Sequence, residues 1–225
     1  MSETRGNVLP VYVVADESAS MSPVIDDLNS GLVSLHDALL REPMAAAKVR
    51  FTIVGFSSDA VVRLARSDLR GEGSLPTLAS RSSTDYGSAF RLLRQLIPRD
   101  IKELKSEGYA CHRPAVFFLT DGQPSDAATW HNEYALLVDR EATPAAPNII
   151  ACGIGEARAD TILDIATRTE FAFVSTPGVE IGLAIAEFCT ALTRSIVASG
   201  RALGSDNAEL VVEKPQNFRM AVDIV

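Results

Sequence analysis

Short apolar runs alternate with longer segments of helical spacing along this chain. Four runs have the length and composition of buried strands, and they cover residues 11–15, 116–119, 149–154 and 171–174. A run that is apolar at nearly every position is typical of a strand covered on both faces of a parallel sheet. Strands that alternate with helices therefore predict crossover units and a mainly parallel sheet.

Two segments have clear helical spacing. In the first, apolar residues recur every three or four positions, at Ile25, Leu28, Leu32, Leu35 and Leu39. Ser22 and Pro23 precede them, and a capping residue followed by proline favours a helix start. The closing helix has a similar face, formed by Ile181, Ile185, Phe188, Leu192 and Ile196. Gly200 favours an end for this helix nearby, and a further helix is expected over about 87–97.

Residues 49–56 and 60–65 are two β-prone runs joined by a short polar link, which predicts a hairpin that adds an antiparallel strand. The predicted fold is α/β and doubly wound, with a mainly parallel central sheet, one antiparallel edge strand and helices on both faces. We expect residues 1–204 to form this domain. Residues 205–225 form a tail with two β-prone runs, which either packs as a hairpin on the sheet edge or pairs with another protein; we favour the hairpin.

Composition narrows the classes of function. The chain has 225 residues, 47% of them apolar and 22% charged, which suits one domain with a full core. Its net charge of -8 argues against nucleic acid as a partner, because such binding depends on clustered Lys and Arg. No apolar run approaches the roughly 20 residues of a membrane span, and the first residues lack the pattern of a secretory signal. We therefore expect a cytoplasmic protein without a membrane partner.

The cysteines and histidines do not form a recognisable metal site. Cys111, Cys152 and Cys189 have no metal-ligand spacing, and we expect them to be small buried apolar groups. The three histidines, at positions 36, 112 and 131, have no partner spacing either, so each is interpreted as a surface or locally bonded side chain.

The strongest chemical signal lies where the first strand gives way to the first helix. Asp16, Ser18 and Ser20 place one carboxylate and two hydroxyls within five residues. In an open parallel sheet, ligands bind outside the carboxyl ends of the strands, where the strand order reverses. Oxygen-only ligation is what a hard cation such as Mg²⁺ prefers.

Two further segments supply oxygens at predicted strand ends. Thr84 lies in Ser-Thr-Asp-Tyr-Gly, which leads into a helix, and Asp121 lies in Leu-Thr-Asp-Gly-Gln-Pro, which closes a strand. We expect Gly122 to allow a tight turn and Gly87 to let the backbone pass close to the site. Each segment alone is typical of a helix cap or a turn, but together they predict one cation site.

These three segments, VYVVADESAS, SSTDYGSAF and VFFLTDGQPSD, resemble the ligand segments of the von Willebrand factor A domain. The metal-ion-dependent adhesion site of that family, abbreviated MIDAS, has the pattern Asp-x-Ser-x-Ser, then Thr, then Asp. The resemblance runs from about residue 10 to 199. It implies a site for Mg²⁺, with Mn²⁺ or Ca²⁺ as alternatives, on Asp16, Ser18, Ser20, Thr84 and Asp121.

The resemblance also implies how each residue would act. Ser18 and Ser20 would bind the metal directly, Thr84 directly or through water, and Asp16 and Asp121 largely through water. An open coordination position would take a carboxylate from an Asp or Glu of a partner protein. The chain departs from many relatives at Glu17 and Ala19, neither of which is a motif ligand. Glu17 is expected either to add negative charge near the cation or to contact a neighbouring basic group.

Within the superfamily, the opening LPVYVVADESASM and the overall layout are most similar to stand-alone bacterial A domains called TerY-like. Those proteins accompany tellurium-resistance and related stress systems. This resemblance implies an intracellular bacterial protein of such a system.

The favoured function is a metal-dependent protein-interaction module rather than an enzyme, with Tyr86, Asp126 and Arg81 as candidates for an exposed rim. One alternative is a Mg²⁺-dependent hydrolase or phosphoryl-transfer enzyme. The chain lacks a phosphate-binding loop and a nucleophile elbow, which argues against it. Another alternative is a structural scaffold whose metal site is idle.

Overall fold

The central strand of the fold pairs with neighbours on both sides. The computed structural model describes residues 5–126, 129–203 and 209–223. Within them, one sheet has the strand order β3-β2-β1-β5-β6-β7-β8, and β4 pairs with the beginning of β1. The strands are β1 Gly6–Asp16, β2 Val49–Phe56, β3 Ala60–Ser67, β4 Tyr109–Cys111, β5 Ala115–Thr120, β6 Asn148–Gly153, β7 Ala172–Ser175 and β8 Phe218–Met220. The helices are α1 Ile25–Leu40, α2 Pro43–Ala46, α3 Tyr86–Ser106, α4 Trp130–Val138, α5 Ala159–Ile165 and α6 Ile181–Ala202.

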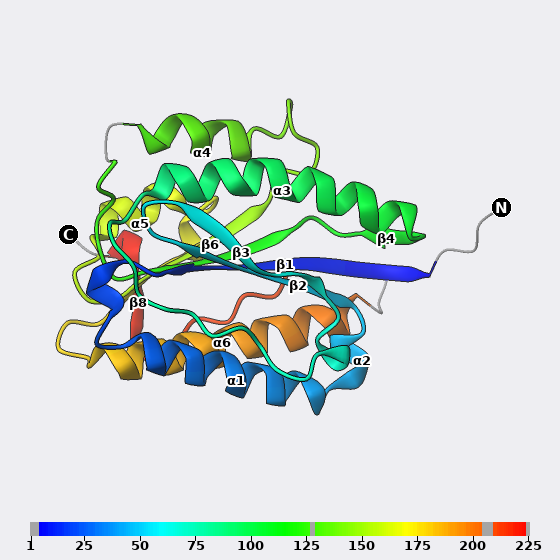
Figure 1. Cartoon of the computed structure of the whole chain (residues 1–225), viewed down its shortest axis with the longest axis horizontal. Helices are drawn as coiled ribbons and strands as arrows, with labels where there is room; N and C mark the ends of the chain where they lie inside the picture. Colours follow the sequence, from blue (N-terminus) through cyan, green and yellow to red (C-terminus); the bar gives the residue numbers. More distant parts are fainter. Residues whose placement is uncertain (1–4, 127–128, 204–208, 224–225) are drawn as a thin grey trace.

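Helices cover both faces of the sheet, as predicted (Figure 1). The side chains of β1 alternate between two cores, because successive residues of a strand point to opposite faces. Val11 and Val13 pack with α1 and α6 on one face. Tyr12 and Val14 pack with α3 and α4 on the other face. The four predicted parallel strands and the predicted hairpin are confirmed.

The strand order reverses beside β1. The chain continues from β1 to β2 on one side, and β5 pairs with β1 in parallel on the other. The register sets Ala15 opposite Leu119. Asp16 and Thr120 therefore follow at the same carboxyl edge of the sheet, which is where open α/β sheets form their ligand crevices.

Both edges of the sheet carry an antiparallel strand, whereas the sequence predicted one. β3 pairs with β2 as expected, and β8 pairs with β7. The predicted hairpin in the tail is wrong, because residues 210–212 form no strand. Instead, Val211 N–H donates to Ser199 Oγ at 2.9 Å and Glu213 N–H donates to Ser195 Oγ at 2.9 Å. Two serines of α6 thus take the place of a partner strand, while the predicted boundary at 204 and residues 205–208, 224 and 225 lie outside the described residues.

Three helix ends differ from the sequence expectation. α1 begins at Ile25, and Ser22 is not its cap, because the short 3₁₀ helix Ala19–Met21 occupies the preceding residues. α3 continues past Pro98 to Ser106, since its later apolar residues Ile101 and Leu104 are still buried against the sheet.

Gly200 lies inside α6 rather than at its end. A Cβ at this position would come within 2.8 Å of the Ala45 carbonyl oxygen. The glycine therefore serves the close packing of α6 on α2, and the helix continues to Ala202.

α6 is long and apolar enough to cross a membrane by length and composition alone, with a mean hydropathy of 1.5. This differs from the expectation drawn from the sequence. One face of α6 packs on the sheet through Ile185, Phe188 and Leu192, which are buried. The core helix of a folded domain passes the same test, so the finding is weak evidence for a span.

In the part of the chain that the structure describes, the cysteines and histidines do not gather into a metal-binding group. All three cysteines are free, and Cys152 and Cys189 are buried as predicted, whereas Cys111 is half-buried. Burial raises the pKa of Cys189 to about 12, so its thiol is inert at neutral pH. His36 is buried with its Nε2 atom 2.8 Å from the Leu69 carbonyl oxygen, and the ring of His131 stacks on Trp130.

Replacing Gly31 by alanine should destabilise the domain, although the same change usually stabilises a helix. A Cβ at Gly31 would lie 2.5 Å from Cys189 Sγ, where α1 packs against α6. We expect Gly31→Ala to lower the free energy of unfolding by roughly 1–3 kcal/mol in urea titrations. The loss should be much smaller when Gly31→Ala is made in a Cys189→Ala background, and equal losses in both backgrounds would contradict this packing.

Candidate metal centre

The carboxylate of Asp16 is buried at the reversal point of the sheet. Its Oδ1 accepts the backbone N–H of Ser18 at 2.8 Å, which closes a tight turn after β1. Its Oδ2 accepts the hydroxyl of Thr120 at 2.6 Å, from the end of β5. Asp16 and Thr120 are both 0% exposed, so the two strand ends are joined by a hydrogen bond that water does not reach.

The two serines link Asp16 to Asp121. Ser20 Oγ donates to Asp121 Oδ1 at 2.8 Å, and Ser18 Oγ lies 3.0 Å from Ser20 Oγ. Because each hydroxyl has one hydrogen, Ser18 is then the donor to Ser20. Ser18 is buried and Ser20 is exposed, so the row of oxygens runs from the interior to the surface.

Thr84 is brought to the same edge through its backbone. Its carbonyl oxygen accepts the N–H and the hydroxyl of Ser125, both at 2.8 Å. Ser125 lies four residues after Asp121, and Ala19 N–H donates to the carbonyl of Ser82 at 2.8 Å. The loop before α3 is therefore tied to both of the other predicted ligand segments.

The two carboxylates carry charge that no cation of the described chain balances. Burial raises the pKa of Asp16 and of Asp121 above the ordinary value for aspartate, and for Asp16 the nearby Asp121 raises it further. Hydrogen bonds from Ser18 and Thr120 oppose this shift at Asp16, and one from Ser20 opposes it at Asp121. No Lys, Arg or His among the described residues forms an ion pair with either.

These residues fit a divalent cation by the chemistry of their donors. A buried pair of carboxylates with neighbouring hydroxyls offers only hard oxygen ligands. No group of three His, Cys, Asp or Glu side chains suited to a metal occurs among residues 5–126, 129–203 and 209–223. A cation at this edge would accordingly need the serine and threonine oxygens to complete its shell.

Glu17 contacts neighbouring basic groups, which is the second of the two roles expected for it. Its carboxylate is fully buried and accepts Arg63 Nη2 at 2.7 Å and Arg63 Nε at 3.1 Å. Arg81 Nε forms an ion pair with it at 2.9 Å. Gly55 makes room for the group, because a Cβ there would lie 2.3 Å from Glu17 Cδ.

The expected exposed rim is wrong for Tyr86. Its ring is 0% exposed, and its one hydroxyl hydrogen is shared between Thr120 Oγ1 at 3.1 Å and the Gly122 carbonyl at 3.0 Å. Asp126 is also engaged, since its two oxygens accept the N–H groups of Tyr86 and Gly87 at the start of α3. Tyr86 and Asp126 therefore support the centre through hydrogen bonds to its backbone and side chains. Arg81 forms ion pairs with Asp59 and Glu17.

Sequence reasoning missed two supports of the centre. Thr120 joins Tyr86 to Asp16, and the signal for it was a hydroxyl residue at the last position of a buried strand. Gly155 has a φ of +58°, which favours glycine, and a Cβ added there would lie 3.5 Å from the Asp121 carbonyl oxygen. Gly122 has no close neighbour around its Cβ position, so nothing in the structure requires a glycine there.

Asp121→Asn should make the metal-free protein more stable at neutral pH, because asparagine can still accept the Ser20 hydrogen bond without a buried charge. The rise in Tm should be a few degrees, at about 2–4 °C per kcal/mol for a chain of this size. Since the folded pKa of Asp121 is raised, the wild-type carboxylate destabilises the fold increasingly as pH rises through that pKa.

The advantage of the Asp121→Asn variant should therefore shrink as the pH is lowered from neutral toward the ordinary pKa of aspartate. Thermal melts in EDTA across this range measure it, with the exposed Asp37→Asn as the control. A variant that is less stable than the wild type at every pH would show that the Asp121 charge is compensated.

No family model and no curated protein matches this sequence, but solved structures match its fold. A structure of proximal thread matrix protein 1 from the mussel byssus, described with a zinc-occupied MIDAS motif, has a TM-score of 0.58 at 15% identity. The match covers 87% of this chain and 49% of the mussel protein's chain. The pilus adhesin SpaC from Lactobacillus rhamnosus GG, in its open conformation, has a TM-score of 0.63 at 12% identity, covering 87% of this chain and 30% of its own.

A von Willebrand factor type A structure from Catenulispora acidiphila has a TM-score of 0.52 at 14% identity, covering 85% of this chain and 43% of its own. The chain thus spans less than half the length of each of these three proteins. Their identities to it are low, so the likeness concerns the path of the backbone. The sheet order, the helices on both faces and these neighbours together show that the chain has the α/β fold of the von Willebrand factor type A domain.

Proposed function

We propose that this protein is a divalent-cation-dependent protein-interaction module without catalytic activity. The cation is Mg²⁺, and its ligand residues are Asp16, Ser18, Ser20, Thr84 and Asp121. The observation that carries this proposal is the buried, uncompensated pair Asp16 and Asp121, joined through two serine hydroxyls at the reversal point of the sheet.

The partner is a protein that offers the carboxylate of an Asp or Glu. Ser20 is exposed, whereas Ser18 and Asp121 on either side of it are buried, so the row of oxygens opens to solvent at Ser20. A cation held by neutral hydroxyls and few direct carboxylates stays electrophilic enough to attract an acidic side chain. The zinc-occupied motif of the mussel protein and the description of SpaC as an adhesin support this direction.

A narrower assignment rests on the sequence alone. We infer that the protein acts in the bacterial cytoplasm, in a TerY-like role within a tellurium-resistance or related stress system. The similarity of residues 9–21 to the opening of those proteins supports this inference.

The arrangement of the centre favours binding over catalysis. A nucleophilic serine is typically activated by a histidine that a carboxylate orients. Ser18 and Ser20 bond instead to each other and to Asp121, while His36 bonds to the carbonyl of Leu69 on another part of the molecule. No observation on the described residues favours the hydrolase or phosphoryl-transfer alternative.

Calorimetric titration of Mg²⁺ into metal-stripped protein should show one saturable site. The double variant Ser18→Ala, Ser20→Ala should lose it, because it removes two oxygen ligands while leaving the carboxylates in place. Parallel titrations with Mn²⁺, Ca²⁺ and Zn²⁺ would rank the cations.

The matched control is Ser34→Ala, Ser106→Ala, which removes two exposed serines on α1 and α3. It should bind Mg²⁺ like the wild type. Equal Mg²⁺ binding by both double variants would remove the site assigned here and leave the fold unchanged.

Asp16→Ala separates an interaction module from a scaffold that needs its metal. The two apolar cores do not depend on the site, so the variant should remain folded in EDTA, with a Tm within several degrees of the metal-free wild type. Circular dichroism melts with and without Mg²⁺ measure this. A cooperative fold that appears only when Mg²⁺ is added to the wild type, and never in the variant, would favour the scaffold.

A further inference from the structure

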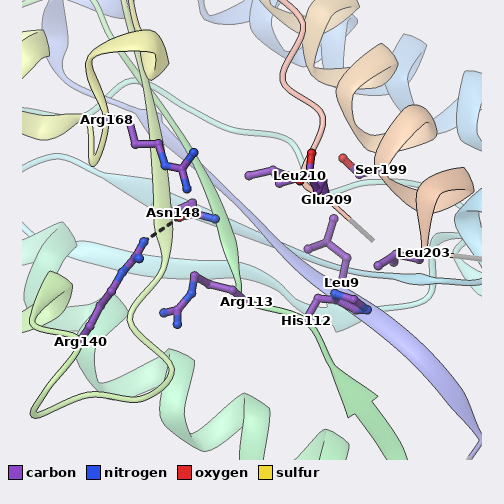
Figure 2. A pocket seen from close by; sticks show the side chains of 10 residues that line it. All are labelled: Leu9, His112, Arg113, Arg140, Asn148, Arg168, Ser199, Leu203, Glu209 and Leu210. Atoms are coloured by element: carbon purple, nitrogen blue, oxygen red, sulfur yellow. Dashed lines mark hydrogen bonds between the residues drawn. The ribbon is translucent and has the colours of Figure 1, made fainter. Parts of the chain in front are cut away.

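A polar pocket lies at the opposite end of the sheet from the metal centre. Arg113 precedes β5, Asn148 begins β6, and Arg168 precedes β7, so the pocket lies at the amino ends of these strands. Arg140, which follows α4, completes this side, and the pocket has a volume of about 190 Å³. Figure 2 shows Arg140 and Arg168 reaching toward Asn148 from different segments, with Arg113 beside them.

Positive charge gathers here in a chain whose net charge is -8. Among the described residues, Arg113 and Arg140 form no ion pair with a carboxylate. Burial lowers the pKa of Arg113, and the positive charge of Arg140 lowers it further. The two guanidinium groups are therefore close enough to repel each other. Arg168 is paired only with the exposed Glu170, at 3.6 Å.

Neutral groups hold these arginines in place. Arg113 Nη1 donates to the Ala146 carbonyl at 2.5 Å, and Arg140 Nη2 donates to Asn148 Oδ1 at 3.1 Å. The guanidinium of Arg168 lies over the ring of Phe171, 5.4 Å from its centre. These contacts fix the orientation of the groups, and Arg113 and Arg140 keep no carboxylate partner among the described residues, so the pocket is preorganised for an anion.

We propose that this pocket binds one phosphate group, either as free phosphate or as the monoester of a small soluble molecule, with Arg113, Arg140 and Arg168 around it. Planar guanidinium groups match phosphate oxygens with pairs of hydrogen bonds. The volume is below the range of about 300–1,000 Å³ of pockets for drug-sized ligands, and so suits one small anion. Glu209 lies on the other side of the pocket in Figure 2, where it disfavours a second anionic group.

Calorimetry with inorganic phosphate and with glycerol phosphate at low ionic strength tests the proposal on the full chain. The wild type should bind both at one site. The double variant Arg113→Gln, Arg140→Gln should bind at least about tenfold more weakly, since it loses both unpaired guanidinium groups. Acetate, which carries one charge and a smaller fork of oxygens, should bind more weakly than phosphate.

The charge-matched control is Arg91→Gln, Arg94→Gln on α3, where both arginines pair with Glu133. It should bind phosphate like the wild type. Arg140→Lys keeps the positive charge but loses the paired N–H groups of the guanidinium. It should bind phosphate more weakly than the wild type and more tightly than Arg140→Gln, which separates paired hydrogen bonds from general charge attraction.

Equal weakening in the two double variants, or no saturable heat with either phosphate, would overturn the proposal. Melting temperatures show whether the double variant has lost its fold. If it has, the single variants Arg140→Gln and Arg168→Gln replace it in the test, because both arginines are exposed. Binding of inorganic phosphate without glycerol phosphate would identify free phosphate as the ligand, and binding of both would show that the pocket also accepts a monoester. The Ser18→Ala, Ser20→Ala variant should bind phosphate normally, which keeps this test separate from that of the metal centre.

Discussion

The parallel pairing of β1 with both β2 and β5 is the constraint on which the rest of the molecule depends. It buries the strand from Val8 to Asp16 and makes the order of the sheet reverse at its carboxyl end. The hydrogen bond from Thr120 to Asp16 closes the gap between β1 and β5 at that point. A carboxylate in a water-free position is costly unless its charge is compensated or neutralised, and the burial of Asp16 supports the proposal of a cation there.

The supporting groups are arranged so that the carboxylate keeps one geometry. Tyr86 donates to Thr120, which donates to Asp16, and all three are buried. The N-terminal end of α3 is held by Asp126 through the N–H groups of Tyr86 and Gly87. One helix, two strands and the loop after β5 therefore determine the position of a single oxygen pair, and networks of this kind are rigid when every member is satisfied.

The sequence was sufficient for the strands, because their apolar runs are local, and for the convergence of Asp16 and Asp121, because parallel strands end at one edge. It was insufficient where a distant contact overrides local propensity. Pro98 is tolerated inside α3 because the residues after it are buried, and Gly200 is needed for contact with α2. The burial of Tyr86 could not be read from its neighbours in sequence, since its partners come from β5 and the loop that follows.

The ion pairs of Glu17 couple residues 17–20, here called the serine loop, to the edge strand β3. Arg63 belongs to β3, and the N–H of Arg81 also donates to the Glu17 carbonyl. Glu17 thus connects three segments through its ion pairs and its carbonyl: the serine loop, the segment that leads to Thr84, and the edge strand β3. A force applied at Ser20 would therefore pass through Glu17 into β3 rather than act on the loop alone.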